Sequence, residues 1–191
     1  MLLEQLKSEG NQEAWQRVDE RFRGIVFGAA RRVGLDEADA ADVAQETMVQ
    51  CLRDFRAGGY DRARGRLSGW IIAIAHNRIS DVLRRKQRAN QDVGDTSLVA
   101  LPAVDAVSAA WNEALRDDLF RRSWERLQAE SGQNPATIKA FELAVIRGVP
   151  TQAVAQECGL TVDQVYLAKN RVSGKLREIV EEMTKAYEDG L

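Results

Sequence analysis

The stretch TQAVAQECGLTVDQVYLAKNR, residues 151–171, has the pattern of two short helices joined by a tight turn. Gly159 lies where the chain must reverse, because glycine adopts a left-handed conformation at little cost. Thr161 can cap the second helix, and Gln164 three residues later completes a capping box. Ala155 is small where two helices would cross closely. The stretch therefore predicts a helix-turn-helix, whose second helix enters the DNA major groove.

The alternative for this stretch is an ordinary helical hairpin that binds no nucleic acid. Either structure needs the same inward stripe, which Val154, Ala155, Cys158, Val165 and Ala168 supply. A match to the pattern is therefore only a hypothesis when taken alone. The agreement of small, apolar, glycine and capping positions favours DNA binding, and the rest of the chain must decide how the hairpin is used.

The composition indicates a helical, globular chain. Its 191 residues allow one domain or two small ones, and 45% of them are hydrophobic and 29% charged. Only three prolines occur, and most glycines fall between periodic segments, which favours an all-α fold. No uncharged run approaches the roughly 20 residues of a membrane span. We expect a cytoplasmic protein that does not enter a membrane.

The charge distribution argues against strong, sequence-blind DNA binding. The net charge is −2, although residues 1–90 carry 16 basic and 13 acidic side chains. Attraction to phosphates depends on local basic patches rather than on the total. The acidic balance therefore favours a protein that a larger partner delivers to DNA.

Residues with catalytic or metal-binding chemistry are scarce. His76 is the only histidine, and Cys51 and Cys158 lie far apart on apolar helix faces, where we expect two buried thiols. No acid–base pair, metal-ligand set or cofactor motif surrounds them. The sequence predicts no enzyme activity, no metal and no cofactor.

Two helices are expected at the start of the chain. The first has apolar residues at Trp15, Val18, Phe22, Ile25, Val26 and Ala29. The second begins around Asp36, and its expected core stripe is Ala41, Ala44, Met48, Cys51, Leu52 and Phe55. Another face of this helix carries Asp42, Gln45, Glu46, Val49 and Arg53. A solvated surface is the plain interpretation of that face.

An arginine-rich loop and a long helix follow. The loop, residues 57–67, contains Tyr60, Arg62, Arg64 and Arg66, and Ser68 can cap the helix after it. The expected buried stripe of that helix is Ile71, Ile74, Ala75, Ile79 and Val82. Away from the stripe lie Trp70, Asn77 and Arg84, with Arg78, Asp81 and Arg85 flanking it. Aromatic, amide and arginine side chains together suit stacking on unpaired bases, although Trp70 alone also fits a partly buried core position.

The periodicity fades over residues 90–110, which we interpret as a flexible linker. Residues 1–89 would form one domain and residues 111–191 another. A helical pattern returns with Trp111, Leu115, Leu119, Phe120, Trp124 and Leu127. Asn134 and Pro135 then begin a helix, to which Ile138, Phe141, Leu143, Val145 and Ile146 contribute apolar side chains.

The order of these parts resembles a bacterial RNA polymerase sigma factor of the small extracytoplasmic-function (ECF) type. The resemblance rests on DVAQET at residues 42–47, on the helix that begins with GWIIAIAHNR at residues 69–78, and on the final hairpin. It implies an all-α fold of two small helical domains joined by a flexible linker. It also implies a non-enzymatic protein that binds core polymerase and directs promoter recognition, DNA melting and transcription initiation.

The resemblance assigns roles to three sets of residues. Asp42, Gln45, Glu46, Val49 and Arg53 would contact the clamp helices of the polymerase β′ subunit. Tyr60, Arg62, Arg64, Arg66, Trp70, Asn77, Arg78, Asp81, Arg84 and Arg85 would bind the melted minus-ten element. Thr161, Gln164, Tyr166, Leu167, Lys169, Asn170, Arg171 and Lys175 would bind the minus-thirty-five element as duplex DNA.

The expected partners are thus core polymerase and promoter DNA, with regulation by a separate anti-sigma protein or by expression level. Two other classes remain open from the residues alone. One is a stand-alone regulator that uses only its helix-turn-helix, and the other is a helical adaptor that never contacts nucleic acid. Binding to core polymerase distinguishes the first interpretation from both.

Overall fold

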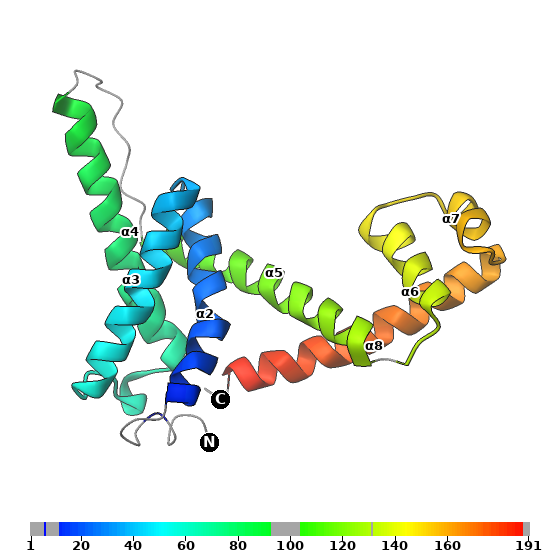
Figure 1. Ribbon diagram of the computed structural model, residues 1–191, viewed down its shortest axis with the longest axis horizontal. Helices are drawn as coiled ribbons and strands as arrows, with labels where there is room; N and C mark the ends of the chain where they lie inside the picture. Colours follow the sequence, from blue (N-terminus) through cyan, green and yellow to red (C-terminus); the bar gives the residue numbers. More distant parts are fainter. Residues whose placement is uncertain (1–5, 7–11, 93–103, 131, 189–191) are drawn as a thin grey trace. The chain divides into compact units, whose positions relative to one another are not determined.

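The computed structural model describes residue 6 and residues 12–92, 104–130 and 132–188 (Figure 1). All regular structure in these ranges is helical, which confirms the all-α prediction. The chain divides into two compact units, of which the first reaches Asp118 and the second comprises Leu119–Tyr187. The division falls inside helix α5 (Val104–Glu130), so Trp111 belongs to the first unit.

The first unit is built on α2 (Gln12–Arg32), α3 (Glu37–Arg56) and α4 (Leu67–Asp92). The chain reverses between α2 and α3, which lie side by side (Figure 1). The Asp36 side chain caps α3 by accepting a hydrogen bond from the Asp39 backbone N–H at 2.9 Å. The core of the unit forms where α2, α3 and α4 meet, around the fully buried side chains Phe22, Ile25, Val43, Ile71 and Ile79.

The core faces of α3 and α4 differ in detail from the expected stripes. Ala41 is exposed and Leu52 is half-buried, whereas Ala40, Val43 and Thr47 are buried. Residues 40, 41 and 44 are all alanine, so the sequence allowed two different buried faces for α3. Packing against α2 and α4 buries Ala40 and Ala44 and leaves Ala41 exposed. In α4 the helix begins at the buried Leu67, so Ser68 lies inside the first turn and the prediction that it caps the helix is wrong. Ile74 is half-buried.

The start of α5 packs on α2 instead of forming a linker. Val107, Ala110, Trp111 and Ala114 are buried, and the Trp111 ring stacks on Phe22 with 6.2 Å between centroids. Arg32 forms ion pairs with Glu113, at 3.5 Å, and with Asp117. Residues 104–110 are therefore helical, contrary to the linker interpretation, because two of them complete a stripe with Trp111. Residues 93–103 of the expected linker lie outside the described residues.

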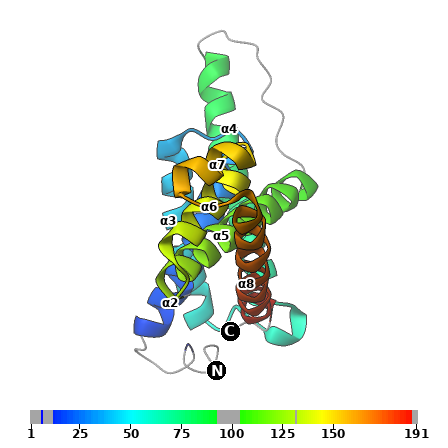
Figure 2. The same ribbon diagram turned by 90° about the vertical axis from the view of Figure 1, so that its right-hand side faces the viewer.

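The second unit contains the end of α5, α6 (Pro135–Phe141), the π-helix η2 (Glu142–Ile146), α7 (Thr151–Cys158) and α8 (Val162–Glu188). Helices α6 and α7 gather at the N-terminal end of α8 (Figure 2). Asn134 caps α6 by accepting from the Ala136 N–H, with Pro135 in the first turn, as expected. The apolar side chains of α6, η2, α7 and the start of α8 form one core cluster, made of Ala140, Leu143, Val154, Ala155, Val165 and Ala168.

The helix-turn-helix prediction is confirmed in its local details. Gly159 has the left-handed conformation, with φ 64° and ψ 33°. The Thr161 N–H donates to Gln164 Oε1 at 2.8 Å, and the Gln164 N–H donates to Thr161 Oγ1 at 3.1 Å. These reciprocal bonds are the expected capping box. Cys158 at the end of α7 is half-buried, whereas Cys51 in the first unit is buried.

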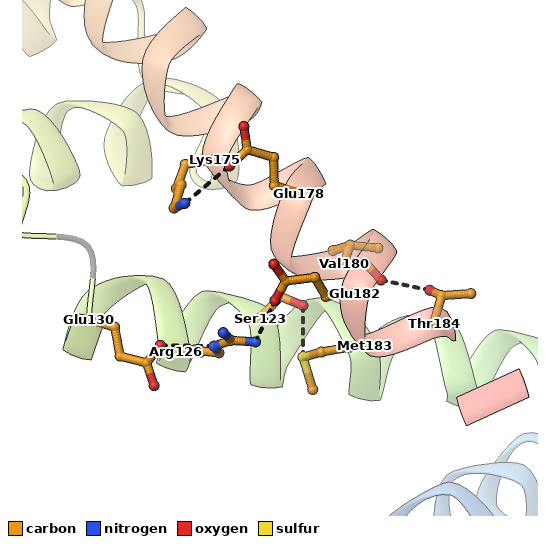
Figure 3. Close-up of polar contacts among 9 residues, drawn as sticks. All are labelled: Ser123, Arg126, Glu130, Lys175, Glu178, Val180, Glu182, Met183 and Thr184. Atoms are coloured by element: carbon orange, nitrogen blue, oxygen red, sulfur yellow. Dashed lines mark hydrogen bonds and ion pairs between the residues drawn. The ribbon is translucent and has the colours of Figure 1, made fainter. Parts of the chain in front are cut away.

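The far part of α8 packs along the second half of α5 (Figure 3). Ser123 Oγ donates to Met183 Sδ at 3.3 Å, and Arg126 bridges Glu130 and Glu182 at 2.9 and 3.0 Å. Three residues that were expected to be apolar core, Phe120, Val145 and Ile146, are instead 43–46% exposed. For the last two the cause is the π-helix, whose wider turn changes the face on which they lie.

Candidate functional sites

The first candidate site is the outer face of α3. Asp42, Gln45, Glu46, Val49 and Arg53 are all exposed there, and Val49 is 41% exposed despite being apolar. They line a shallow hollow of about 500 Å³, and Gln50 and Arg78 complete its lining. Two carboxylates, an exposed apolar side chain and two guanidinium groups thus share one surface. Such a mixture suits a protein partner better than nucleic acid.

Arg78 belongs to this α3 surface, although the sequence grouped it with the DNA-binding candidates. Its Nη2 donates to Gln50 Oε1 at 2.9 Å, and Gln50 Nε2 donates to Asp54 Oδ1 at 2.7 Å. The sequence did not single out Gln50. Its role depends on how α4 packs across α3, which a helical period cannot reveal, because the period fixes faces only within one helix.

The second candidate site is a hollow of about 410 Å³ at the arginine-rich loop. It is lined by Gly59, Tyr60, Asp61, Arg64, Gly65, Arg66, Gly69 and Trp70. The Tyr60 and Trp70 rings lie 5.3 Å apart between centroids, tilted by 47°. The structure thus brings together four of the predicted residues, Tyr60, Arg64, Arg66 and Trp70. Arg62 lies in the neighbouring helical turn and does not line the hollow.

A chain of aromatic contacts ties this hollow to the core of the first unit. Tyr60 stacks on Phe55 at 5.8 Å, and Phe55 meets Trp15 edge-on at 5.2 Å. The Tyr60 hydroxyl donates to the Gly65 carbonyl at 3.2 Å, which closes the loop. Partial burial raises the pKa of Tyr60, against the opposing effect of the Arg62 cation. The hydroxyl therefore remains a donor at neutral pH.

The loop backbone is shaped by one aspartate and two glycines. Asp61 caps the short 3-10 helix η1 (Arg62–Arg64) by accepting from the Ala63 N–H at 2.9 Å. A side chain at Gly59 would meet the Asp54 carbonyl oxygen at 2.9 Å, so only glycine fits without a shift. Gly65 has a positive φ of 152°, which other residues rarely adopt.

The remaining candidates on α4 are exposed along its outer surface. Asn77, Asp81, Arg84 and Arg85 are exposed, and Asp81 pairs with Arg84 at 3.5 Å. Lys86 differs from its basic neighbours because its ammonium group pairs with both Asp36 and Asp39. The Asp39 backbone N–H and Lys86 lower the pKa of Asp36 to about 2, and both carboxylates raise the pKa of Lys86. Lys86 therefore joins α4 to the start of α3.

The third candidate site is the outer face of α8. Tyr166, Leu167, Asn170 and Arg171 are exposed, and Lys169 Nζ lies 5.6 Å from the centre of the Tyr166 ring. Lys175 is exposed and pairs with Glu178 at 3.1 Å (Figure 3). Thr161 and Gln164 are occupied in the capping box, so their first role is to begin the helix.

Membrane-spanning helices and metal-binding clusters are both absent from the described residues. Within residues 12–92, 104–130 and 132–188, no helix combines the length and apolar character that a membrane span requires. The same ranges contain no group of three or more His, Cys, Asp or Glu side chains placed to hold a metal ion.

The chain is similar to several known proteins. Residues 18–89 match the family model for sigma-70 region 2. The chain is 26% identical over 170 residues to the ECF RNA polymerase sigma factor SigK of Mycobacterium bovis (strain BCG / Pasteur 1173P2), covering 88% of this chain and 85% of that protein. It is 31% identical over 91 residues to SigK of Mycobacterium sp. (strain KMS), covering 48% and 46% of the two chains. A solved structure of CnrH in complex with the cytosolic domain of CnrY matches with 20% identity and a TM-score of 0.38, over 95% and 96% of the two chains.

The region 2 match covers the α3 face, the loop hollow and most of α4, and the longer alignments extend the likeness across most of the chain. These proteins are non-enzymatic subunits of the transcription machinery. The chain belongs to the ECF type of the sigma-70 family, whose members direct transcription initiation by RNA polymerase.

Proposed function

We propose that the first unit binds core polymerase with the outer face of α3 and captures a melted minus-ten element with the Tyr60–Trp70 hollow. The second unit reads the minus-thirty-five element with α8. The observation that carries the proposal is the separation of two chemically different surfaces on one unit. One surface is mixed and carboxylate-bearing, and the other is aromatic and arginine-rich.

The aromatic hollow suits a base that has left the duplex. Removing a base from the stack costs a few kcal/mol, which new stacking and backbone contacts must offset. Tyr60 and Trp70 offer ring faces, and Arg64 and Arg66 offer cations beside them. Stacking on an aromatic side chain contributes about 1–3 kcal/mol per base. One base in the hollow therefore recovers much of the cost.

The α3 surface would fix the sigma factor to the polymerase. Asp42 and Glu46 lie one helical turn apart on exposed positions, so a cationic partner surface could pair with both. Arg78, held by Gln50, would lie beside them. In this arrangement Arg78 supports the polymerase contact and not the DNA contact. An anti-sigma partner and a cytoplasmic place of action, where polymerase and chromosome meet, remain predictions that follow from this role.

The test of the proposal is binding to core polymerase followed by transcription. The full chain should form a complex with core enzyme that starts run-off transcription at a defined genomic promoter, while neither component does so alone. The double variant Asp42→Lys and Glu46→Lys should fail to bind core enzyme while keeping its helical circular dichroism spectrum. Glu13→Lys, whose side chain is 86% exposed on α2, is the matched control and should bind normally.

Two outcomes would contradict the proposal. If the Lys variant bound core enzyme as well as the parent, the α3 face would not be the polymerase contact. If the free protein instead bound a duplex operator tightly without core enzyme, the alternative of a stand-alone helix-turn-helix regulator would hold.

A further inference from the structure

The outward row of α8 is formed by Asp163, Leu167, Asn170 and Gly174. Their spacings of four, three and four residues place them on one side of a helix with 3.6 residues per turn. The opposite side is the buried stripe of Val165, Ala168 and Val172. This row therefore faces any ligand that binds to the outer side of the second helix. Asp163 was not among the residues predicted from the sequence for this face.

Leu167 is the most exposed large hydrophobic side chain among the described residues. It is 62% exposed, and its neighbour Tyr166 is 52% exposed. A single exposed leucine is ordinary on a protein surface. Leu167, however, is the sixth residue of the second helix of a helix-turn-helix, in the part of that helix whose side chains reach base edges.

Over residues 163–174 the positive charges of α8 lie beside the outward row, and the first cation on the row itself is Arg177, three residues after Gly174. Lys169 is drawn toward the Tyr166 ring on one side, and Arg171 is exposed on the other. Phosphates border the major groove on both sides, and the base edges lie between them. A row without cations over this stretch, bordered by cations, matches that distribution of charge. Thr161, directly before the helix, and Gln164 in its first turn are occupied in its cap.

The major groove displays one apolar group, the 5-methyl group of thymine. We propose that Leu167 reads a thymine of the minus-thirty-five element through this methyl group, with Tyr166 shielding the contact from water. The inference rests on the proposed function, in which α8 enters the groove, and it names the base feature that this helix recognises. Burying one methyl group, worth about 0.8 kcal/mol, corresponds to about fourfold in affinity.

The experiment uses reconstituted holoenzyme and the promoter found by run-off transcription. Each thymine of the upstream element is replaced in turn by deoxyuridine, which removes only the methyl group, and promoter affinity is measured by fluorescence anisotropy. At one thymine the replacement should weaken binding about fourfold. Holoenzyme with Leu167→Ala should bind the parent promoter with a similar loss and should no longer respond to deoxyuridine there.

Two further variants sharpen the experiment. Val145→Ala is the matched control, because Val145 is 46% exposed in η2 of the same unit, and it should retain the deoxyuridine effect. Arg171→Ala should reduce the slope of log affinity against log salt by about one, as a lost phosphate contact does. Leu167→Ala should leave that slope unchanged, since a methyl contact releases no counterion.

Several results would overturn the inference. If Leu167→Ala keeps the full deoxyuridine effect, or if no thymine of the element responds in the parent holoenzyme, Leu167 does not read a methyl group. If Leu167→Ala weakened binding to core polymerase without DNA, the exposed pair would be a protein contact instead. Failure of the proposed function has a different signature, since the holoenzyme would then not form or not transcribe, and the inference would fall with it.

Discussion

The two proposed DNA-binding surfaces are held in place by different means. Tyr60 and Trp70 in the first unit lie on a chain of rings that reaches Trp15, far away in sequence. The Leu167 side chain in the second unit is exposed to solvent, and its orientation is set by its position in helix α8. The first surface therefore depends on long-range packing, and the second on local rules of helix start and turn. Distant substitutions should damage the first, and turn or cap substitutions the second.

The largest effect is expected from Phe55→Ala. Phe55 is 9% exposed and touches both Trp15 and Tyr60, so its loss leaves a cavity under the loop. Removing a buried phenylalanine costs about 3–5 kcal/mol of stability. Urea denaturation should show this loss, and minus-ten binding should fall with it. Leu167→Ala is the contrasting variant, because a surface change of this kind stays within about 0.5 kcal/mol. Equal losses in both variants would contradict the comparison.

The next largest effect is expected at the turn of the second unit. Gly159→Ala forces a side chain into the left-handed conformation at φ 64°, which costs about 1–2 kcal/mol. No heavy atom lies within 4 Å of the added Cβ, so the cost comes from the backbone alone. Hydrogen exchange of α7 and thermal melting would measure it.

Gly174→Ala is the matched control for that substitution. Gly174 lies within α8, also with nothing within 4 Å of an added Cβ. Alanine is preferred over glycine inside a helix by about 0.5–1 kcal/mol, so this variant should be more stable than the parent. An unchanged stability of Gly159→Ala would show that the turn is not set by backbone conformation. A loss of stability in Gly174→Ala would contradict the assignment of position 174 to an unstrained helix interior.

A smaller effect is expected from Tyr60→Phe. The change removes the hydroxyl that donates to the Gly65 carbonyl at 3.2 Å and keeps the ring contacts with Phe55 and Trp70. One such hydrogen bond contributes about 0.5–1.5 kcal/mol. Amide exchange around Gly65 should accelerate, while urea stability changes little. Tyr60→Ala should do more damage, because it also removes the ring, and equal effects of the two variants would contradict the stacked arrangement.

The smallest effect is expected from Asp36→Asn, and it depends on pH. The pKa of Asp36 is lowered to about 2 from 3.8, so the carboxylate stabilises the fold above its unfolded pKa. That contribution is lost as the pH falls from about 4 toward 2. The raised pKa of Lys86 gives a contribution that is complete below its unfolded value and is lost only at alkaline pH.

Asparagine can still cap α3, so Asp36→Asn removes the charge and keeps the cap. The curve of unfolding free energy against pH should therefore become flatter between about pH 4 and pH 2. Lys86→Gln should leave most of that slope, because the Asp39 N–H is the largest cause of the lowered pKa of Asp36. An unchanged slope in the Asp36 variant would contradict the assignment.

Three local features of the second unit were predicted well because neighbouring residues determine them. The turn at Gly159, the capping box of Thr161 and Gln164, and the start of α6 at Pro135 all agree with the structure. The expected faces agree at large apolar residues such as Phe22 and Ile71, although not at Phe120. The predicted buried face is wrong at Ala41, where neighbouring alanines allowed two alternative faces. It is also wrong at Val145, where a π-helix interrupts the helical period.

The candidate sites show the same difference between features within one helix and features that depend on packing between helices. The sequence identified the residues of the α3 face and the outer face of α8, since each lies on one helix. It did not join Arg78 to Gln50, Tyr60 to Phe55, or Trp111 to Phe22. Each of these pairs joins separate segments of the chain, and no periodicity relates them.

The sequence by itself determined the helices, the helix-turn-helix and the residues available on each outer face, because helix propensity, caps and turns act over a few neighbouring residues. Only the tertiary structure decided that α5 begins as part of the first unit, that Arg78 faces the α3 surface, and that Tyr60 and Trp70 share a hollow. Those outcomes depend on how helices pack across one another. Packing is chosen by side-chain contacts between distant segments, which a pattern within one segment does not contain.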